Sequence, residues 1–164
     1  MAMIKRVGYG QVEPNHLSAQ RNGQVYGQLP AAAEIEVLEN GQFVKYDYAK
    51  GVCNFKGAGE WMLVYNEVKL YDSFWRETYK DFAMKKKNCD KGEMVPRVLK
   101  TMPGDIFTTN CIGAEGEDVE VESILKINDK GYLSLTGDSD IEFQVVKVYT
   151  MPDGQPAVKV MRVK

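Results

Sequence analysis

Few residues of this chain have the types and spacing that catalysis requires. General acid–base catalysis needs a positioned histidine or a carboxylate with a shifted pKa, and the single histidine, His16, lies in a polar N-terminal segment. The sequence contains no Gly-x-Ser-x-Gly element, no Walker loop, no His-Glu-x-x-His and no dinucleotide fingerprint. It therefore predicts no catalytic residue and no cofactor, and leaves open only an enzyme whose residues come together from distant segments.

The patterns of metal ligands are equally incomplete. Asp138, Asp140 and Glu142 could ligate calcium, but the rest of a calcium-binding loop is missing, so a turn is the favoured interpretation. The three cysteines are far apart and form no Cys-x-x-Cys pair, which argues against a zinc site and against a disulfide framework. We expect reduced thiols, with Cys53 and Cys111 buried as small apolar residues, and no bound metal.

The composition is that of an ordinary globular protein. Of 164 residues, 44% are hydrophobic and 27% are charged, and this length accommodates one large domain or two small ones. The net charge is −2, from 21 basic and 23 acidic residues, which disfavours a broad nucleic-acid-binding surface but leaves a local basic patch open. No apolar run approaches the roughly 20 residues that span a bilayer, so no transmembrane segment is predicted. The N-terminus lacks the apolar core of a signal peptide, so no secretory signal is predicted.

The strongest structural signal is a C-terminal hairpin. Residues 141–150 and 157–163 are rich in β-branched residues and flank a Pro-Asp-Gly turn at 152–154. The alternation of apolar residues slips at Val145–Val146, which predicts a β-bulge there. Such a hairpin is marginal alone, so other strands must cover its apolar face.

Further strands are predicted upstream. Asn40-Gly41 suits a tight turn and predicts a hairpin between residues 34–38 and 42–48. Residues 61–65 are continuously apolar, which predicts a strand buried on both faces. The fold class predicted is mainly β, with β-hairpins, a small β-barrel or sandwich, and one short helical segment.

The helical segment is predicted over residues 72–87. Asp72 or Ser73 can cap its N-terminus, and three lysines lie where the C-terminal end of a helix favours cations. Its aromatic side chains could form a partner-binding face, although such a stripe more often packs on a sheet. These aromatic residues are Phe74, Trp75, Tyr79 and Phe82.

The patterns divide the chain into three parts. Residues 1–30 have few large aliphatic side chains and are predicted to form an N-terminal arm or a weak hairpin, between 16–21 and 24–29. Residues 31–93 form a β-rich half that contains the helical segment. Residues 94–164 carry short strands at spacings typical of a small closed or nearly closed β-barrel.

The stretches Leu38–Asp47 and Gly104–Asn110, together with the closing hairpin, resemble small capsid-associated proteins of tailed bacteriophages, which are head decoration or head-fibre-base proteins. The resemblance implies a non-enzymatic virion protein, assembled in the host cytoplasm, that binds the capsid shell as an oligomer. Its implied partners are the major capsid protein or other virion proteins, with no membrane and no small-molecule substrate. Residues 72–87 depart from a minimal β-only decoration protein.

We therefore expect a capsid-bound structural protein whose arm, residues 1–29, docks on the shell. The predicted partner-contact residues lie in the arm and in the helical segment, and they are Tyr9, His16, Arg21, Tyr26, Phe74, Trp75 and Tyr79. The alternative is a carbohydrate- or nucleic-acid-binding β-barrel in which Trp61, Trp75 and exposed tyrosines provide stacking surfaces.

Overall fold

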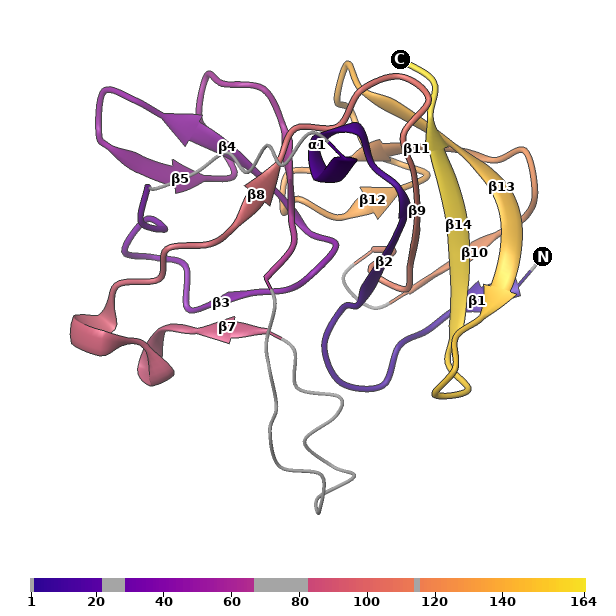
Figure 1. The fold of residues 1–164 in the computed structure, drawn as a ribbon, viewed down its shortest axis with the longest axis horizontal. Helices are drawn as coiled ribbons and strands as arrows, with labels where there is room; N and C mark the ends of the chain where they lie inside the picture. The colour runs from indigo at the N-terminus through magenta and orange to yellow at the C-terminus, as the bar shows by residue number, and fades with distance from the viewer. Residues whose placement is uncertain (1, 22–28, 67–82, 114–115) are drawn as a thin grey trace.

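The computed structural model describes residues 2–21, 29–66, 83–113 and 116–164, and it confirms that the fold is mainly β (Figure 1). The larger sheet has six strands in the spatial order β12 (Leu133–Ser134), β11 (Ile124–Ile127), β13 (Glu142–Thr150), β14 (Pro156–Arg162), β9 (Ile106–Thr109) and β2 (Val12–His16). The smaller sheet has four strands in the order β5 (Val52–Asn54), β4 (Phe43–Asp47), β6 (Met62–Val64) and β8 (Val98–Leu99).

Two strand pairs and a few helical turns complete the described chain. The pairs are β1 (Ala2–Ile4) with β10 (Glu117–Val119), and β3 (Val37–Leu38) with β7 (Met84–Lys85). The helical elements are short: α1 (Ser18–Arg21) and two 3-10 helices, Lys86–Asn88 and Asp90–Gly92. No helix within the described ranges is long and apolar enough to cross a membrane.

The C-terminal hairpin is confirmed and dominates the larger sheet. Strands β13 and β14 pair from Phe143–Arg162 to Thr150–Pro156, and the register shifts between Val145 and Lys147, where the bulge was predicted. The bulge keeps Val145 in the core while Val146 points to solvent.

The predicted barrel over residues 94–164 is wrong as a closed structure. Among the described strands, the larger sheet begins at β12 and ends at β2, so its hydrogen bonding does not close into a ring. Strand β8 lies at the start of the predicted barrel but pairs with β6 in the smaller sheet. The predicted division at residue 93 therefore does not separate the two sheets.

The predicted N-terminal arm is also wrong over residues 2–19. Strand β1 pairs with β10, and β2 adds to the edge of β9. Ile4 and Leu17 are fully buried, at 0% and 1% exposed. Apolar side chains are few in this segment, but Ile4, Leu17 and Ala19 lie in the core, and their burial provides the ordering energy that the composition alone did not suggest. Of the predicted weak hairpin, residues 16–21 contain the end of β2 and α1 rather than a strand, and residues 22–28 lie outside the described chain.

The smaller sheet is buried on both faces, as predicted for residues 61–65. Phe43 and Leu63 face the core shared with the larger sheet. Val44, Met62 and Val64 face a second core, which residues 31–38 and 84–98 cover. Within the shared core, three phenylalanine rings pack at tilted or edge-on angles, with centroids 5.4 to 6.4 Å apart, and they are Phe43, Phe107 and Phe143.

The hairpin predicted at Asn40-Gly41 is wrong in its strand pairing. The turn exists, because Gln42 N–H donates to the Glu39 carbonyl at 3.2 Å, but β3 pairs with β7 and β4 pairs with β5 and β6. The reason is that this turn is buried between the sheets instead of lying exposed at a hairpin tip.

The predicted helix over residues 72–87 lies mostly outside the described residues. Its described end is not α-helical, because Met84–Lys85 form strand β7 and a 3-10 helix begins at Lys86. The pairing of β7 with β3 supplies backbone hydrogen bonds that compete with a helix here.

Leu17 tests whether the N-terminal segment belongs to the body. We expect Leu17→Ala to lower the free energy of unfolding by about 3 kcal/mol, because it leaves a cavity in the core. Val7→Ala is the matched control, since Val7 is an exposed residue of the same segment and should change stability by less than about 0.5 kcal/mol. Urea unfolding of both variants measures this, and equal stabilities would show that the segment is only loosely attached.

Candidate functional site

The predicted partner-contact residues do not form one site in the described chain. Tyr9 is half-buried, and the Lys85 ammonium lies 4.6 Å from the centre of its ring. His16 is exposed at the end of β2, opposite Ile106. Arg21 belongs to α1, and Tyr26, Phe74, Trp75 and Tyr79 lie outside the described residues.

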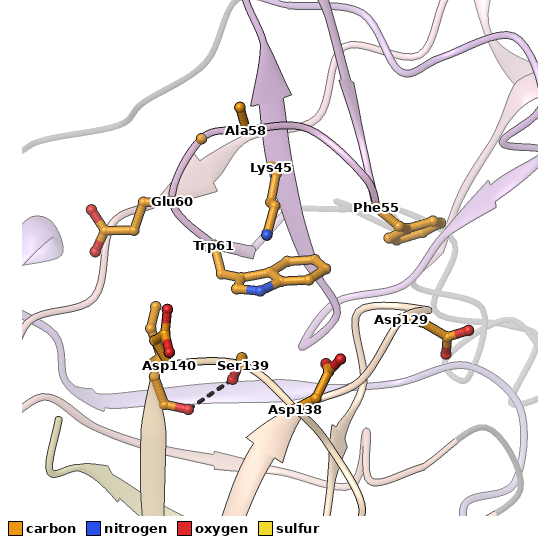
Figure 2. A pocket seen from close by; sticks show the side chains of 11 residues that line it. Lys45, Phe55, Ala58, Glu60, Trp61, Asp129, Asp138, Ser139 and Asp140 are labelled. Atoms are coloured by element: carbon orange, nitrogen blue, oxygen red, sulfur yellow. Dashed lines mark hydrogen bonds between the residues drawn. The ribbon is translucent and has the colours of Figure 1, made fainter.

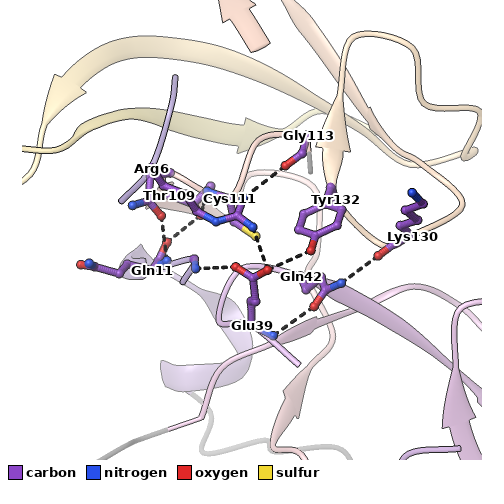
Figure 3. Close-up of polar contacts among 11 residues, drawn as sticks. Arg6, Gln11, Glu39, Gln42, Thr109, Cys111, Gly113, Lys130 and Tyr132 are labelled. Atoms are coloured by element: carbon purple, nitrogen blue, oxygen red, sulfur yellow. Dashed lines mark hydrogen bonds and ion pairs between the residues drawn. The ribbon is translucent and has the colours of Figure 1, made fainter. Parts of the chain in front are cut away.

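A buried polar cluster, which we call the junction network, joins three distant segments (Figure 3). Its centre is the Glu39 carboxylate, whose residue is 6% exposed. The Arg6 guanidinium donates to Oε1 at 2.7 Å, the Tyr132 hydroxyl donates to Oε1 at 2.8 Å, and the Gly10 N–H donates to Oε2 at 2.6 Å. The buried charge is therefore both paired and hydrogen-bonded, as a stable buried carboxylate requires.

The junction network extends into the backbone of its neighbours. Arg6 also donates to the Gly113 carbonyl at 3.3 Å and lies 5.4 Å from the centre of the Tyr132 ring. Gln42 accepts from Glu39 N–H at 3.0 Å and donates to the Lys130 carbonyl at 2.9 Å. These bonds fix the side chains, so the network holds the fold together rather than presenting a free acid or base.

Gly41 shows how closely the segments approach at this junction. Its φ is +92°, and a Cβ atom there would lie 2.6 Å from Thr109 Oγ1 and 2.8 Å from Cys111 Cβ. Only glycine combines this backbone angle with this contact. The stretches Leu38–Asp47 and Gly104–Asn110, which carry the resemblance, therefore meet at the junction.

The buried titratable groups are poor nucleophiles. Burial raises the pKa of the Cys53 thiol to about 11, and burial followed by the Glu39 charge raises the pKa of Cys111 above its ordinary value. Burial and then the charge of Glu39 also raise the pKa of Tyr132. The cysteines are all free, and these two buried thiols remain protonated at neutral pH, so they act as apolar packing groups.

The second feature is an open cavity of about 500 Å³ between loops of the two sheets (Figure 2). Lys45 of β4 and Trp61, just before β6, line it from the smaller sheet. Asp129, Asp138 and Asp140 line it from turns of the larger sheet. The Lys45 ammonium lies 4.7 Å from the centre of the Trp61 ring.

The backbone holds these aspartates in place. The turn that carries Asp129 is attached to β4, because Phe43 N–H donates to the Gly131 carbonyl at 2.7 Å. The loop that carries Asp138 and Asp140 is held by buried Ser139, whose hydroxyl accepts from Ile127 N–H at 2.9 Å and donates to the Ile141 carbonyl at 2.8 Å. The cavity is therefore preformed by bonds that do not involve its own carboxylates.

The sequence contained part of the signal for this cavity. Asp138 and Asp140 have the residue type of calcium ligands but predict a turn, and Trp61 is a predicted stacking residue of the alternative function. In the described residues, no three His, Cys, Asp or Glu side chains are placed to hold a metal ion. Lys45 and Asp129 gave no signal: the pairing of β4 with β6 places Lys45 beside Trp61, and the contact between the two sheets brings Asp129 to the same cavity.

The fold and these two features define a mainly β protein in which a buried polar junction joins two sheets and their loops enclose an open cavity. Comparison with protein-family models, with curated proteins and with solved structures gives no match. The function must therefore be argued from the residues themselves.

Glu39 tests the junction network. We expect Glu39→Gln to lower the free energy of unfolding by about 3 kcal/mol, because it leaves the Arg6 guanidinium buried without its counter-charge. Glu36→Gln is the control, since Glu36 is largely exposed in its pair with Lys86 and its loss should cost less than about 1 kcal/mol. Chemical unfolding measures both, and a Glu39 variant as stable as the control would contradict a structural role.

Alkaline pH should destabilise the protein through Cys53 and Tyr46. Burial raises the pKa of Cys53 from 9.0 to about 11 and that of Tyr46 from 10.0 to about 12. The unfolded chain releases these protons first, so the free energy of unfolding should fall as the pH rises from 9.0 toward about 12.

Two variants separate the contributions. Cys53→Ala should reduce the loss that begins near pH 9.0, to which buried Cys111 also contributes. Tyr46→Phe should reduce the loss that begins near pH 10.0, to which Tyr132 also contributes. Tyr46→Phe should also raise stability at neutral pH by about 1 kcal/mol, because the buried Tyr46 hydroxyl has no hydrogen-bond partner within the described ranges. Urea unfolding at several pH values measures both effects, and a flat profile for the unmodified protein would refute them.

Proposed function

We propose that the protein is a non-enzymatic structural protein of a tailed-bacteriophage virion, which binds the assembled capsid shell as an oligomer. The observation that carries this proposal is the position of the three stretches that resemble capsid-associated proteins. The first two meet at the junction, where Gly41 contacts Thr109, and the third, the β13–β14 hairpin, pairs with β9. The resemblance therefore falls on one continuous part of the fold.

The chemistry of the described residues agrees with a structural role. The buried carboxylate of Glu39 is paired and hydrogen-bonded within the protein. Burial keeps the thiols of Cys53 and Cys111 protonated. These groups stabilise the body and do not converge on a reacting substrate. The buried polar residues form internal bonds that make the body rigid, and a rigid body suits a protein that binds a shell.

The shell-binding surface must be other than an N-terminal arm, because residues 2–19 are packed into the body. A better surface is the bulge patch, which consists of the exposed apolar side chains of Val121, Ile124 and Val146. Glu122 N–H donates to the Val145 carbonyl at 2.8 Å, and Val145 N–H donates to the Ser123 carbonyl at 2.9 Å, so the two segments lie side by side. The bulge turns Val146 outward and so extends the patch across both segments.

Immunogold labelling of virions produced by the phage that encodes this chain tests the proposal. We expect gold on the heads, and co-purification of the protein with the particles through a density gradient. The protein recovered only in the soluble part of the lysate would contradict capsid binding.

The bulge patch is tested by a double variant. Ile124→Lys with Val146→Lys should weaken binding to particles lacking the protein by about ten-fold or more, because it places two charges in an apolar contact. Met102→Lys is the control, since Met102 is equally exposed but lies in a turn outside the patch. Co-sedimentation measures binding, and equal binding by both variants would exclude the patch.

A further inference from the structure

The cavity between the two sheets contains an indole donor that the protein does not use. Trp61 is only 8% exposed, yet its N–H donates to no group of the described residues. In Figure 2 the indole lies between Lys45 on one side and the loop of Asp138 and Asp140 on the other, with its nitrogen on the side of the aspartates. This nitrogen is not one of the buried side-chain atoms that lack a hydrogen-bond partner, so the N–H is open to the cavity and accessible to an acceptor on a ligand.

The cavity also presents carboxylates that the protein does not pair. Asp129, Asp138 and Asp140 are exposed and form no hydrogen bond or ion pair with the described residues. Glu60 of the same cavity is different, because Lys100 lies 2.6 Å from its carboxylate and Arg162 lies 3.3 Å from it. Three acceptor groups therefore line the same cavity as the indole donor.

The combination of donors and acceptors excludes several ligand classes. A guanidinium or ammonium group has only donors, so it would satisfy the aspartates but leave the Trp61 N–H unpaired. A phosphate carries negative charge, which the three aspartates would repel. A hydroxyl both donates and accepts, so several hydroxyls on one ligand would satisfy the aspartates, the Trp61 N–H and the Lys45 ammonium together.

We propose that this cavity binds a neutral saccharide, one or two sugar units in size. Its volume of about 500 Å³ lies within the range of small-molecule sites, roughly 300–1,000 Å³. Phe55 and the edge of Trp61 provide an apolar wall for the C–H groups of the sugar ring. Asp129, Asp138 and Asp140 accept from the hydroxyls, and the Trp61 N–H donates to one of them. The site does not depend on capsid binding, so either proposal can fail without the other.

The indole N–H signal of Trp61 in a nitrogen–proton correlation spectrum gives a direct test. The probes are glucose, galactose, mannose, N-acetylglucosamine, maltose and lactose, with arginine amide and inorganic phosphate as the charged comparisons. Trp75→Phe leaves Trp61 as the only tryptophan and so assigns the signal. We expect at least one sugar to shift this signal in a saturable way, while arginine amide and phosphate do not.

Variants identify the cavity as the site. Asp138→Asn with Asp140→Asn should weaken binding of that sugar by about ten-fold or more, because the hydrogen bonds lose their charged acceptors. Asp118→Asn is the control, since Asp118 is also exposed but lies on β10 and does not line the cavity. Trp61→Phe keeps an aromatic ring but removes the donor, and should weaken binding several-fold.

Three results would overturn the proposal. The first is no shift with any sugar, together with no binding on a glycan array. The second is a saturable shift with arginine amide or phosphate in place of sugars. The third is unchanged sugar affinity in the Asp138 and Asp140 double variant, which would place the sugar elsewhere.

Discussion

The burial of one carboxylate, that of Glu39, is the constraint on which the fold depends. A buried charge without partners is costly, so the chain must bring donors to it. Two donors, Arg6 and Gly10, come from the N-terminal segment, and the third, Tyr132, comes from a segment far along the chain. Folding must therefore bring together three segments, namely the N-terminal segment, the turn before β4 and the start of β12. This requirement keeps residues 2–19 in the body, although their composition resembles that of an arm.

The apolar packing fixes the two sheets in the same relation. Phe43 of β4 contacts Phe143 of β13 and Phe107 of β9, so a single side chain joins the sheets at the centre of the core. The backbone of Phe43 also holds the turn of residues 128–131 through its bond to the Gly131 carbonyl. A Cβ atom on Gly131 would clash with the Phe43 carbonyl oxygen, so this turn packs directly against the β4 backbone. The spacing of the loops around the cavity therefore follows from the core, and loop sequence alone does not determine it.

The sequence predicted those features that depend on local pattern. The C-terminal hairpin, its bulge near Val145 and the doubly buried strand at residues 61–65 each follow from alternation or apolar runs, and each is confirmed. The pattern failed where a distant segment supplied the partner. Asn40-Gly41 has the residues of a hairpin turn, but β3 pairs with the distant strand β7, with Val37 opposite Lys85 and Leu38 opposite Met84. Among the described residues, β8 pairs with β6 of the smaller sheet and does not extend the six-stranded sheet, which stays open. No local sequence pattern predicts this pairing.

The candidate site was harder to predict for the same reason. Asp138 and Asp140 look like ordinary turn residues in the sequence, and only the structure places them in one cavity with Trp61, which precedes a strand of the other sheet.

What distinguishes the cavity is a contrast in hydrogen bonding within one molecule. At the junction, Glu39 and its donors are satisfied internally even though the burial of the charge made this difficult. At the cavity, where internal partners would have been easy to supply, an indole donor and three carboxylates stay unpaired. The paired carboxylate stabilises the fold, whereas the unpaired groups of the cavity are available to a ligand.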